Sequence, residues 1–577
     1  MKLIRLKIFQ SFRSLPANFE VHFLQRKKEE EMFQFNPYCL VGRNGSGKSN
    51  ILEALASIFY HMECSNLKNL PASFVYDEEE NPDGFSSEHA AIDGFELEYF
   101  YPLEFQHMTR QGRSVTAPDY NSHIVIKKEI GKSPVVKLKQ SKGDKVIEDL
   151  EERRFYMPDY ILGYSSGENE ILSLPFFKMR FIHYDEYEQA LREKLPYAQP
   201  EGRLIYFDNS FSQAVFLTNY LMQDPKILDP IYKTLGIKGI FQFRIIIRLN
   251  EIRKYYKLTG YTGAEKVKAE DYSEDSEVEI TSLLSTLIQI LKNCATTWEN
   301  DEDILYLDYC IDDETKKAFK ANFDNDPIKL FQSFQILLTL NLFDVSDALK
   351  KELYESNSLY VNETVPILAS DKRIMRFKDL EIDNGAITNE IYSKSLSDGE
   401  HQFLHAMGVC LLFKDSTSLF LLDEPETHFN PDWRSLFIST LRDCLEQADD
   451  KILSEFLITS HSPFIVSDCK KENVIVFEKQ KGKNRKVKVS RPDFNTFGAS
   501  VNLLTHKLFH KEETISEIAN KRLNDILKKF QSGKLNLETA ISTANQLGDS
   551  VEKLIIIDEL KRIKTIQKKK SIPKKKK

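Results

Sequence analysis

The sequence contains no long apolar run. No window of its 577 residues approaches the roughly 18 consecutive apolar residues that a membrane-spanning helix needs. The charged N-terminus MKLIRLKIFQSFR also has no apolar core of a signal peptide. The seven cysteines include no CxxC pair, which argues against a structural metal site and favours a reducing compartment. We therefore expect a soluble, cytoplasmic protein with no membrane partner.

A strongly basic charge is also absent. The chain carries 79 lysine and arginine residues against 87 acidic residues, which gives a formal net charge of −8. This balance argues against a surface that binds nucleic acid over its whole extent, whereas a local basic patch is compatible with it. A hydrophobic content of 41% is enough for packed cores, and the length allows several domains.

The most informative stretch runs from Lys394 to Asn430. A polar turn, Ser397-Asp398-Gly399-Glu400, precedes apolar residues at helical spacing, namely Phe403, Leu404, Met407, Cys410 and Leu411. An apolar run of strand length, 419–422, then ends on Asp423 and Glu424. A turn at a helix start offers N–H groups to an anion. Acids at the carboxyl end of a buried strand lie where α/β proteins place catalytic groups.

A phosphate-binding loop is indicated near the N-terminus. The pattern G-x-x-x-x-G-K-S lies between a short apolar strand and a helical run, which is the context that this motif requires. In such loops backbone N–H groups surround the phosphates, the lysine reaches the β- and γ-phosphates, and the serine hydroxyl binds Mg²⁺. We predict that the nucleotide is bound by Gly42, Arg43, Asn44, Gly45, Ser46, Gly47, Lys48, Ser49 and Asn50.

One histidine is a candidate for the same site. The apolar run 456–459 predicts a strand beside the carboxylate strand, and His461 follows its carboxyl end. A histidine in a loop is usually only solvated, but this placement puts His461 near the expected γ-phosphate. Gln106 is a weaker candidate for a water-positioning residue.

The chain divides into four predicted parts. Residues 1–205 form the first half of a head domain and include an acidic surface loop at 68–98, and residues 206–365 form a mainly helical insertion. Residues 366–500 complete the head, and residues 501–577 form a helical extension that ends in KKKSIPKKKK. Such a lysine run is typical of a solvated tail, with a nucleic-acid contact as the alternative. The helices of the extension are apolar on one face, so they either dock a partner or pack on the head.

Together these motifs resemble those of ABC-class ATPases of the RecF/SMC-like type. The segment 42–49 resembles a Walker A loop, 397–400 the ABC signature turn, 419–424 Walker B, 426–431 the D-loop, and His461 the switch histidine. The fold class that this resemblance implies is α/β, a P-loop NTPase head of ABC type. Its mixed sheet has flanking helices, is interrupted by the mainly helical insertion and is followed by a helical C-terminus.

The resemblance also implies roles for individual residues. Ser49 and Asp423 would hold Mg²⁺, while Glu424, His461 and Lys48 would be catalytic: Glu424 would orient the attacking water, and His461 and Lys48 would contact the γ-phosphate. In this class the signature turn, here Ser397 and Gly399, binds the nucleotide of a second protomer. The implied cofactors are therefore ATP and Mg²⁺, and the implied reaction is hydrolysis of ATP to ADP and phosphate.

The motif variants resemble a particular subset of this class. The sequences LSDGEHQ and DEPETH are similar to those of restriction-system-associated AAA family ATPases and of PtuA-like anti-phage ATPases, which pair with HNH nucleases. The expected assembly is a homodimer, or a higher oligomer built from ATP-sandwich dimers, that regulates an effector such as an HNH-type nuclease in a restriction or anti-phage system. The alternative is a RecF-like DNA-binding repair ATPase. A transporter motor is disfavoured because the chain has no membrane-coupling features.

Overall fold

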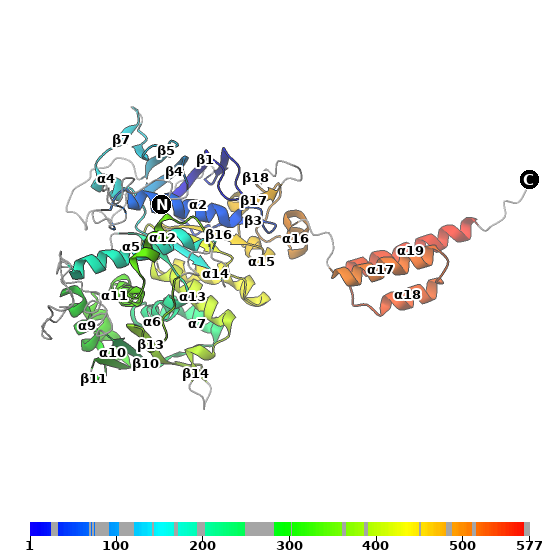
Figure 1. Ribbon diagram of the computed structural model, residues 1–577. Helices are drawn as coiled ribbons and strands as arrows, with labels where there is room; N and C mark the ends of the chain where they lie inside the picture. The colour runs from blue at the N-terminus through cyan, green and yellow to red at the C-terminus, as the bar shows by residue number, and fades with distance from the viewer. Residues whose placement is uncertain are drawn as a thin grey trace, which may run out of the picture. The chain divides into compact units, whose positions relative to one another are not determined.

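Three β-sheets organise the protein in a computed structural model (Figure 1). The structure describes residues 1–24, 33–67, 71, 74, 92–102, 121–140, 143–166, 171–192, 202–248, 282–301, 303–359, 365–385, 391–448, 452–479, 487–509 and 515–570. The chain forms two units, Met1–Phe497 and Gly498–Lys577, and all three sheets belong to the first. Gln106, most of the acidic loop and most of the lysine tail lie outside the described residues.

The central sheet has seven strands in the order β18-β17-β3-β16-β15-β8-β9. Their bounds are β3 Tyr38–Gly42, β8 Ile161–Ser165, β9 Leu204–Tyr206, β15 Leu419–Asp423, β16 Glu455–Ser460, β17 Val474–Lys479 and β18 Val487–Ser490. All neighbouring pairs are parallel except β17 and β18. Because helices cover a parallel sheet on both faces, its strands are continuous apolar runs, and every residue of β3, β8, β15 and β16 is buried.

Helices pack against this sheet and carry the predicted motifs. The loop after β3 leads into α2 (Lys48–Cys64), which contacts β3, β8, β15 and β16. The polar turn at 397–400 begins α13 (Asp398–Leu412), which is followed by β15 and α14 (Pro431–Ala448). Further helices are α4 Leu150–Phe155, α5 Ser173–Arg192, α6 Ser212–Met222 and α15 Pro463–Ser467. This α/β architecture agrees with the predicted fold class.

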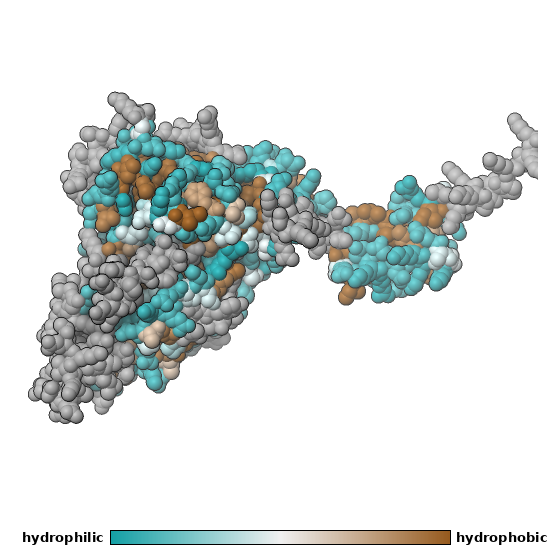
Figure 2. All heavy atoms as spheres, turned by 45° about the horizontal axis from the view of Figure 1, so that its top comes forward, coloured by the Kyte–Doolittle hydropathy of each residue, from teal (hydrophilic) through white to brown (hydrophobic). Residues whose placement is uncertain are grey.

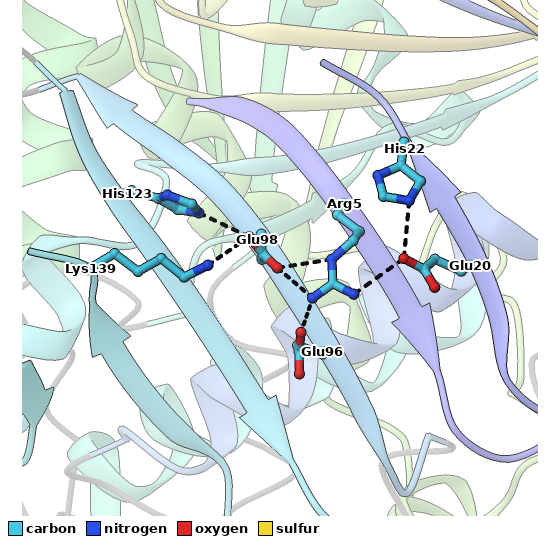
Figure 3. A network of polar contacts seen from close by, with 7 residues as sticks. All are labelled: Arg5, Glu20, His22, Glu96, Glu98, His123 and Lys139. Carbon is cyan, nitrogen blue, oxygen red and sulfur yellow. Dashed lines mark hydrogen bonds and ion pairs between the residues drawn. The ribbon is translucent and has the colours of Figure 1, made fainter. Parts of the chain in front are cut away.

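A six-stranded antiparallel sheet, in the order β2-β1-β4-β5-β6-β7, forms the second layer. Its strands are β1 Lys2–Ile8, β2 Phe19–His22, β4 Phe95–Pro102, β5 Asn121–Lys128, β6 Val135–Leu138 and β7 Lys145–Ile147. The predicted acidic loop ends earlier than expected, because β4 begins at Phe95. Arg5 contacts Glu20, Glu96 and Glu98 on neighbouring strands, and His22, His123 and Lys139 complete this network (Figure 3). Such cross-strand pairs support the register of the sheet.

The third sheet was not predicted as a unit: the sequence indicates a strand at 374–377, which overlaps β13, but not the strands β10, β11 and β12. It has the order β11-β12-β10-β13-β14, and its strands are β10 Gly239–Arg248, β11 Thr297–Asp301, β12 Ile304–Cys310, β13 Met375–Asp383 and β14 Ile391–Tyr392. Three of these strands fall within residues 206–365, which were expected to be mainly helical. The neighbouring helices are α7 Pro225–Leu235, α9 Ser282–Cys294, α10 Asp313–Asn322, α11 Pro327–Thr339 and α12 Asp347–Glu355. The missed signal is the aromatic and β-branched run FQFRIII in β10.

The second unit is helical. It contains α16 Val501–Phe509, α17 Glu517–Gln531, α18 Leu537–Asn545 and α19 Val551–Lys570. Apolar side chains of the last three helices form a small core that includes Leu523, Phe530 and Leu560. Hydrophobic residues also lie exposed between hydrophilic ones on this unit (Figure 2). In the part of the chain that the structure describes, no helix combines the length and apolar character needed to cross a membrane.

Candidate active site

The loop between β3 and α2 is tightly packed where it leaves the sheet. Gly42 has φ +152°, and a Cβ atom at this position would overlap the carbonyl oxygen of Phe477 in β17. Gly47, the residue before α2, has φ +100°, and a Cβ there would lie 3.0 Å from the Ser14 hydroxyl. Residues with side chains rarely adopt such φ values. These two glycines therefore allow the backbone to turn closely around the position of a bound anion.

Lys48 extends from the start of α2 back across this loop. Its Nζ atom donates a hydrogen bond to the carbonyl oxygen of Gly42 at 3.2 Å and lies 2.8 Å from Nε2 of His461. Burial lowers the pKa of Lys48, while the nearby carboxylates of Glu424 and Asp423 act in the opposite direction. A cation held in this way, close to the phosphate-binding loop, would interact strongly with an anionic ligand.

Ser49 and Asp423 meet at the carboxyl end of β15. The Ser49 hydroxyl donates to Oδ1 of Asp423 at 2.7 Å, and the Thr459 hydroxyl donates to the same oxygen at 2.6 Å. Asp423 is fully buried, and burial raises its pKa, although the bonds from Thr459 and Ser49 favour the charged form. Thr459 was not among the predicted site residues, and the only sequence signal is a hydroxyl at the end of the apolar strand.

Glu424 adopts an unusual backbone conformation. Its φ is +47°, a region that few residues other than glycine occupy and that is often found at functional sites. The backbone N–H of Glu424 donates to the Thr459 hydroxyl at 2.9 Å, which holds this conformation. Oε1 of Glu424 lies 3.1 Å from Nε2 of His461, and this hydrogen bond lowers the pKa of Glu424. Both side chains are 31% exposed and therefore accessible to a substrate.

Two other residues near this cluster, Glu426 of the segment that resembles the D-loop and Ser460, were not among the predicted site residues. Glu426 is buried after β15 and accepts a hydrogen bond from the Ser460 hydroxyl at the end of β16. Burial raises the pKa of Glu426. Its bond to Ser460 connects the segment after β15 to the segment that carries His461, so it helps to fix the two sides of the cluster relative to each other.

The remaining predicted residues of the loop differ in exposure. Arg43, Asn44 and Gly45 are exposed, whereas Ser46 is buried and its N–H donates to the carbonyl oxygen of Arg43. Asn50 lies in the first turn of α2 and accepts a hydrogen bond from the Ser14 hydroxyl at 2.6 Å. The described N-terminal hairpin is thereby connected to the start of α2.

The turn at Ser397 forms a helix cap rather than part of the Lys48 cluster. The Ser397 side chain and backbone N–H bond to Glu400, and the Glu400 N–H bonds back to the Ser397 hydroxyl, which is a complete capping box. A Cβ at Gly399 would lie 2.8 Å from the carbonyl oxygen of His428. Ser397 therefore makes its side-chain bonds within its own helix, and it remains exposed.

The described residues bring together donors that suit a magnesium ion. A serine hydroxyl and a carboxylate oxygen are hard oxygen ligands, and Mg²⁺ is usually bound by one or two carboxylates together with water and substrate phosphates. No group of three or more His, Cys, Asp or Glu side chains with metal-binding geometry occurs among the described residues. The pair Ser49 and Asp423 thus fits an ion whose remaining ligands come from substrate and water, and not an ion bound by protein ligands alone.

Comparison with known proteins places these features in a family. Protein ea59 of Escherichia phage lambda is 24% identical over 206 residues, which are 34% of this chain and 37% of that protein. The chain thus spans little more than a third of the length of this relative. The model of a family described as AAA ATPase domain matches residues 1–466, which include the loop at 42–49, the acids after β15 and His461. The chain therefore belongs to the family described as AAA ATPase domain.

Proposed function

We propose that the protein is an Mg²⁺-dependent ATPase of the ABC type, close to the RecF/SMC-like branch, that dimerises around ATP and regulates an effector. The observation that supports the ATPase chemistry is the meeting of Lys48, Ser49, Asp423, Glu424 and His461. Lys48 and Ser49 lie at the start of α2, which follows β3, and the other three residues lie at the carboxyl ends of β15 and β16. The proposed effector is a nuclease of a bacterial restriction or anti-phage system, and this part is supported by the motif variants.

In the proposed reaction, the described residues position ATP and stabilise charge. Phosphoryl transfer depends on positioning and electrostatic stabilisation more than on covalent participation by the protein. Lys48 neutralises charge on the γ-phosphate, and His461 donates a hydrogen bond to it. Glu424, which is held ionised by its contact with His461, orients the attacking water. An Mg²⁺ ion held by Ser49 and Asp423 would supply further charge stabilisation at the phosphates.

The proposed dimer follows from the place of the signature turn. Ser397 is exposed, and its backbone begins α13, a helix of 15 residues. Helix N-termini attract anions, while the side-chain bonds of Ser397 stay within its own turn. We infer that Ser397 and Gly399 contact the γ-phosphate of a nucleotide bound by a partner protomer. ATP would then stabilise the closed dimer because only that state contacts the nucleotide from both sides.

The substitution Glu424→Gln tests both parts of this proposal. It keeps the shape of the side chain and removes the carboxylate, so we expect phosphate release to fall roughly 10²- to 10⁴-fold, the usual contribution of a general base. ATP should still bind, and light scattering should show an ATP-dependent dimer that persists. Glu446→Gln on an exposed helix surface is the matched control. Turnover near that of the unmodified protein would remove Glu424 from this role, and a monomer in saturating ATP would contradict the dimer.

The proposed effector is tested by purification from the native operon. A nuclease subunit that co-purifies and whose activity responds to ATP supports regulation of an effector. A lone dimer that binds DNA duplexes, with affinity that falls steeply as salt increases, supports the RecF-like alternative.

A further inference from the structure

A second cavity lies in the first unit, near the signature turn. Its volume is about 630 Å³, which is within the range of roughly 300–1,000 Å³ that is typical of small-molecule sites. Its wall is formed by parts of α5, by η3 (Asn209–Phe211), by the end of α11 with η5 (Leu340–Leu342), by the first half of β13, and by η7 (Ser393–Ser395). None of the residues of the Lys48 cluster lines it.

The cavity is electropositive. Five cationic side chains line it against two acidic ones, Asp208 and Asp379, and the cationic residues are Arg180, Arg373, Arg376, Lys378 and Lys394. Arg180 is paired with Asp208 at 2.7 Å, and Lys378 with Asp379 at 3.7 Å. Within the described ranges, the other three cations have no ion-pair partner. The wall is therefore suited to an anion.

One of these cations has an unsatisfied donor. The Nε atom of Arg376 is buried and has no hydrogen-bond partner in the described part of the chain. A buried polar group without a partner destabilises the folded protein, and a bound ion or ligand is one arrangement that satisfies it. Arg373, three residues earlier, donates from Nε to the carbonyl oxygen of Leu368 at 3.2 Å. The two guanidinium groups thus project from one short segment of the cavity wall.

The segment that carries the two arginines is held rigidly. Asn341 donates to the carbonyl oxygen of Met375 at 3.1 Å and accepts from its N–H at 3.2 Å. A few residues further on, Asp379 has φ +50° at an irregularity in the pairing of β13 with β10. Such bulges redirect side chains and are common beside functional sites. The backbone segment that carries Arg373 and Arg376 is therefore held in place before any ligand binds, which reduces the entropic cost of binding.

The wall also contains aromatic rings. The guanidinium of Arg180 lies 4.9 Å from the ring centre of Phe211 and 5.6 Å from that of Phe177. Tyr392 also lines the cavity and is 48% exposed. Arginine binds phosphate through paired hydrogen bonds, and exposed aromatic rings stack on nucleobases. From this combination we propose that the cavity is a second ligand site, for a phosphate-bearing small molecule of the mononucleotide class.

The cavity has a direct connection to the signature turn. Tyr392, Ser393 and Lys394 line it, and Ser393 lies four residues before Ser397 in the chain. The Gln213 side chain donates to the Ser393 hydroxyl at 3.2 Å, which joins α6 to η7. A ligand that contacts Lys394 would restrict η7 and thereby the start of α13. Binding of a ligand in the cavity therefore changes ATP turnover. This effect on turnover, unlike the binding itself, rests on the proposed function of Ser397.

The binding step is tested in the full chain with Lys48→Ala, which removes binding at the first site. Calorimetry is performed with AMP, GMP, CMP and UMP, and with inorganic phosphate. We expect saturable binding of at least one nucleotide, weaker binding of phosphate, and a loss of roughly tenfold or more when Arg376→Gln or Arg373→Gln is added, because each removes a charge-assisted hydrogen bond. Arg442→Gln on α14, outside the cavity, should have no effect.

Several results would overturn the proposal. The proposal fails if none of the four nucleotides binds, or if the cavity variants bind them as tightly as the protein without those substitutions. It also fails if inorganic phosphate binds as tightly as the nucleotides. Lys394→Gln changes an exposed side chain and should weaken binding without loss of folding, so it covers the case in which an arginine variant is unstable. If the unmodified protein does not bind ATP, the proposed function is contradicted. The cavity proposal is judged separately, by nucleotide binding to the Lys48→Ala protein.

Discussion

Two glycines of the phosphate-binding loop allow a prediction of stability that is specific to this structure. Gly42 and Gly45 both have positive φ, +152° and +71°, but their surroundings differ. An added Cβ at Gly45 would meet no atom within 4 Å, whereas at Gly42 it would overlap the carbonyl oxygen of Phe477 and lie 2.9 Å from the Ser46 hydroxyl. Replacing each glycine by alanine therefore separates the backbone cost from the packing cost.

The expected magnitudes follow from these contacts. Gly45→Ala should destabilise by about 1–2 kcal/mol, the cost of a left-handed conformation for a residue with a side chain. Gly42→Ala carries a backbone cost of about 1–3 kcal/mol. It also carries a packing cost of about 1–3 kcal/mol, since the overlapping atom belongs to the backbone of β17 and moves less easily than a side chain. Gly42→Ala should thus be more destabilising than Gly45→Ala by roughly 1–3 kcal/mol.

The assay is urea unfolding of the full chain, followed by the fluorescence of Trp433 in α14. Because a protein of this size need not unfold in one step, the midpoints of the first unit are compared instead of extrapolated free energies. Replacing Trp298, the other tryptophan in the chain, by Phe in all samples removes the second signal. Equal midpoints for the two alanine variants would refute the claim that the contact with Phe477 requires a glycine at position 42.

Further predictions concern the candidate site. Lys48→Ala should abolish ATP binding, and unchanged affinity by calorimetry would argue against the role of the loop. Burial raises the pKa of Asp423, so the native protein loses stability as the pH rises through this pKa. Asp423→Asn should therefore raise the melting temperature of the nucleotide-free protein, with a larger gain at high pH than at low pH; a gain only at low pH would contradict this. Glu400→Ala breaks the capping box and should lower the stability measured by calorimetry by about 0.3–1.5 kcal/mol, whereas the exposed Glu446→Ala should have little effect. Removal of Mg²⁺ with EDTA should stop phosphate release, and unchanged turnover would argue against a metal at Ser49.

Parts of the site could be predicted because their determinants are local. The loop at 42–49 is identified by glycine and lysine spacing, since its function requires a short backbone turn before a helix. The capping box at Ser397 and Glu400 is also a local pattern, with partners three residues apart. The AAA ATPase domain assignment supports the same general chemistry.

Other parts depended on contacts between distant segments. Thr459 bonds to Asp423 only because β15 and β16 are adjacent and in register. No sequence pattern marked Arg373 and Arg376 as site residues, and their cavity exists because α5, α11 and β13 meet around them. Strands β10, β11 and β12 of the third sheet were missed in a segment where helical periodicity was the stronger signal.

The sequence alone determined the class of chemistry, because the residues that bind phosphate and metal follow short, ordered patterns. The tertiary structure decided which side chains touch. It placed His461 between Lys48 and Glu424, with contacts of 2.8 Å and 3.1 Å, and it formed a second, positively charged cavity beside the signature turn. The physical reason is that burial of apolar surface over the whole unit sets the strand order and the helix packing. A short sequence pattern does not predict this burial.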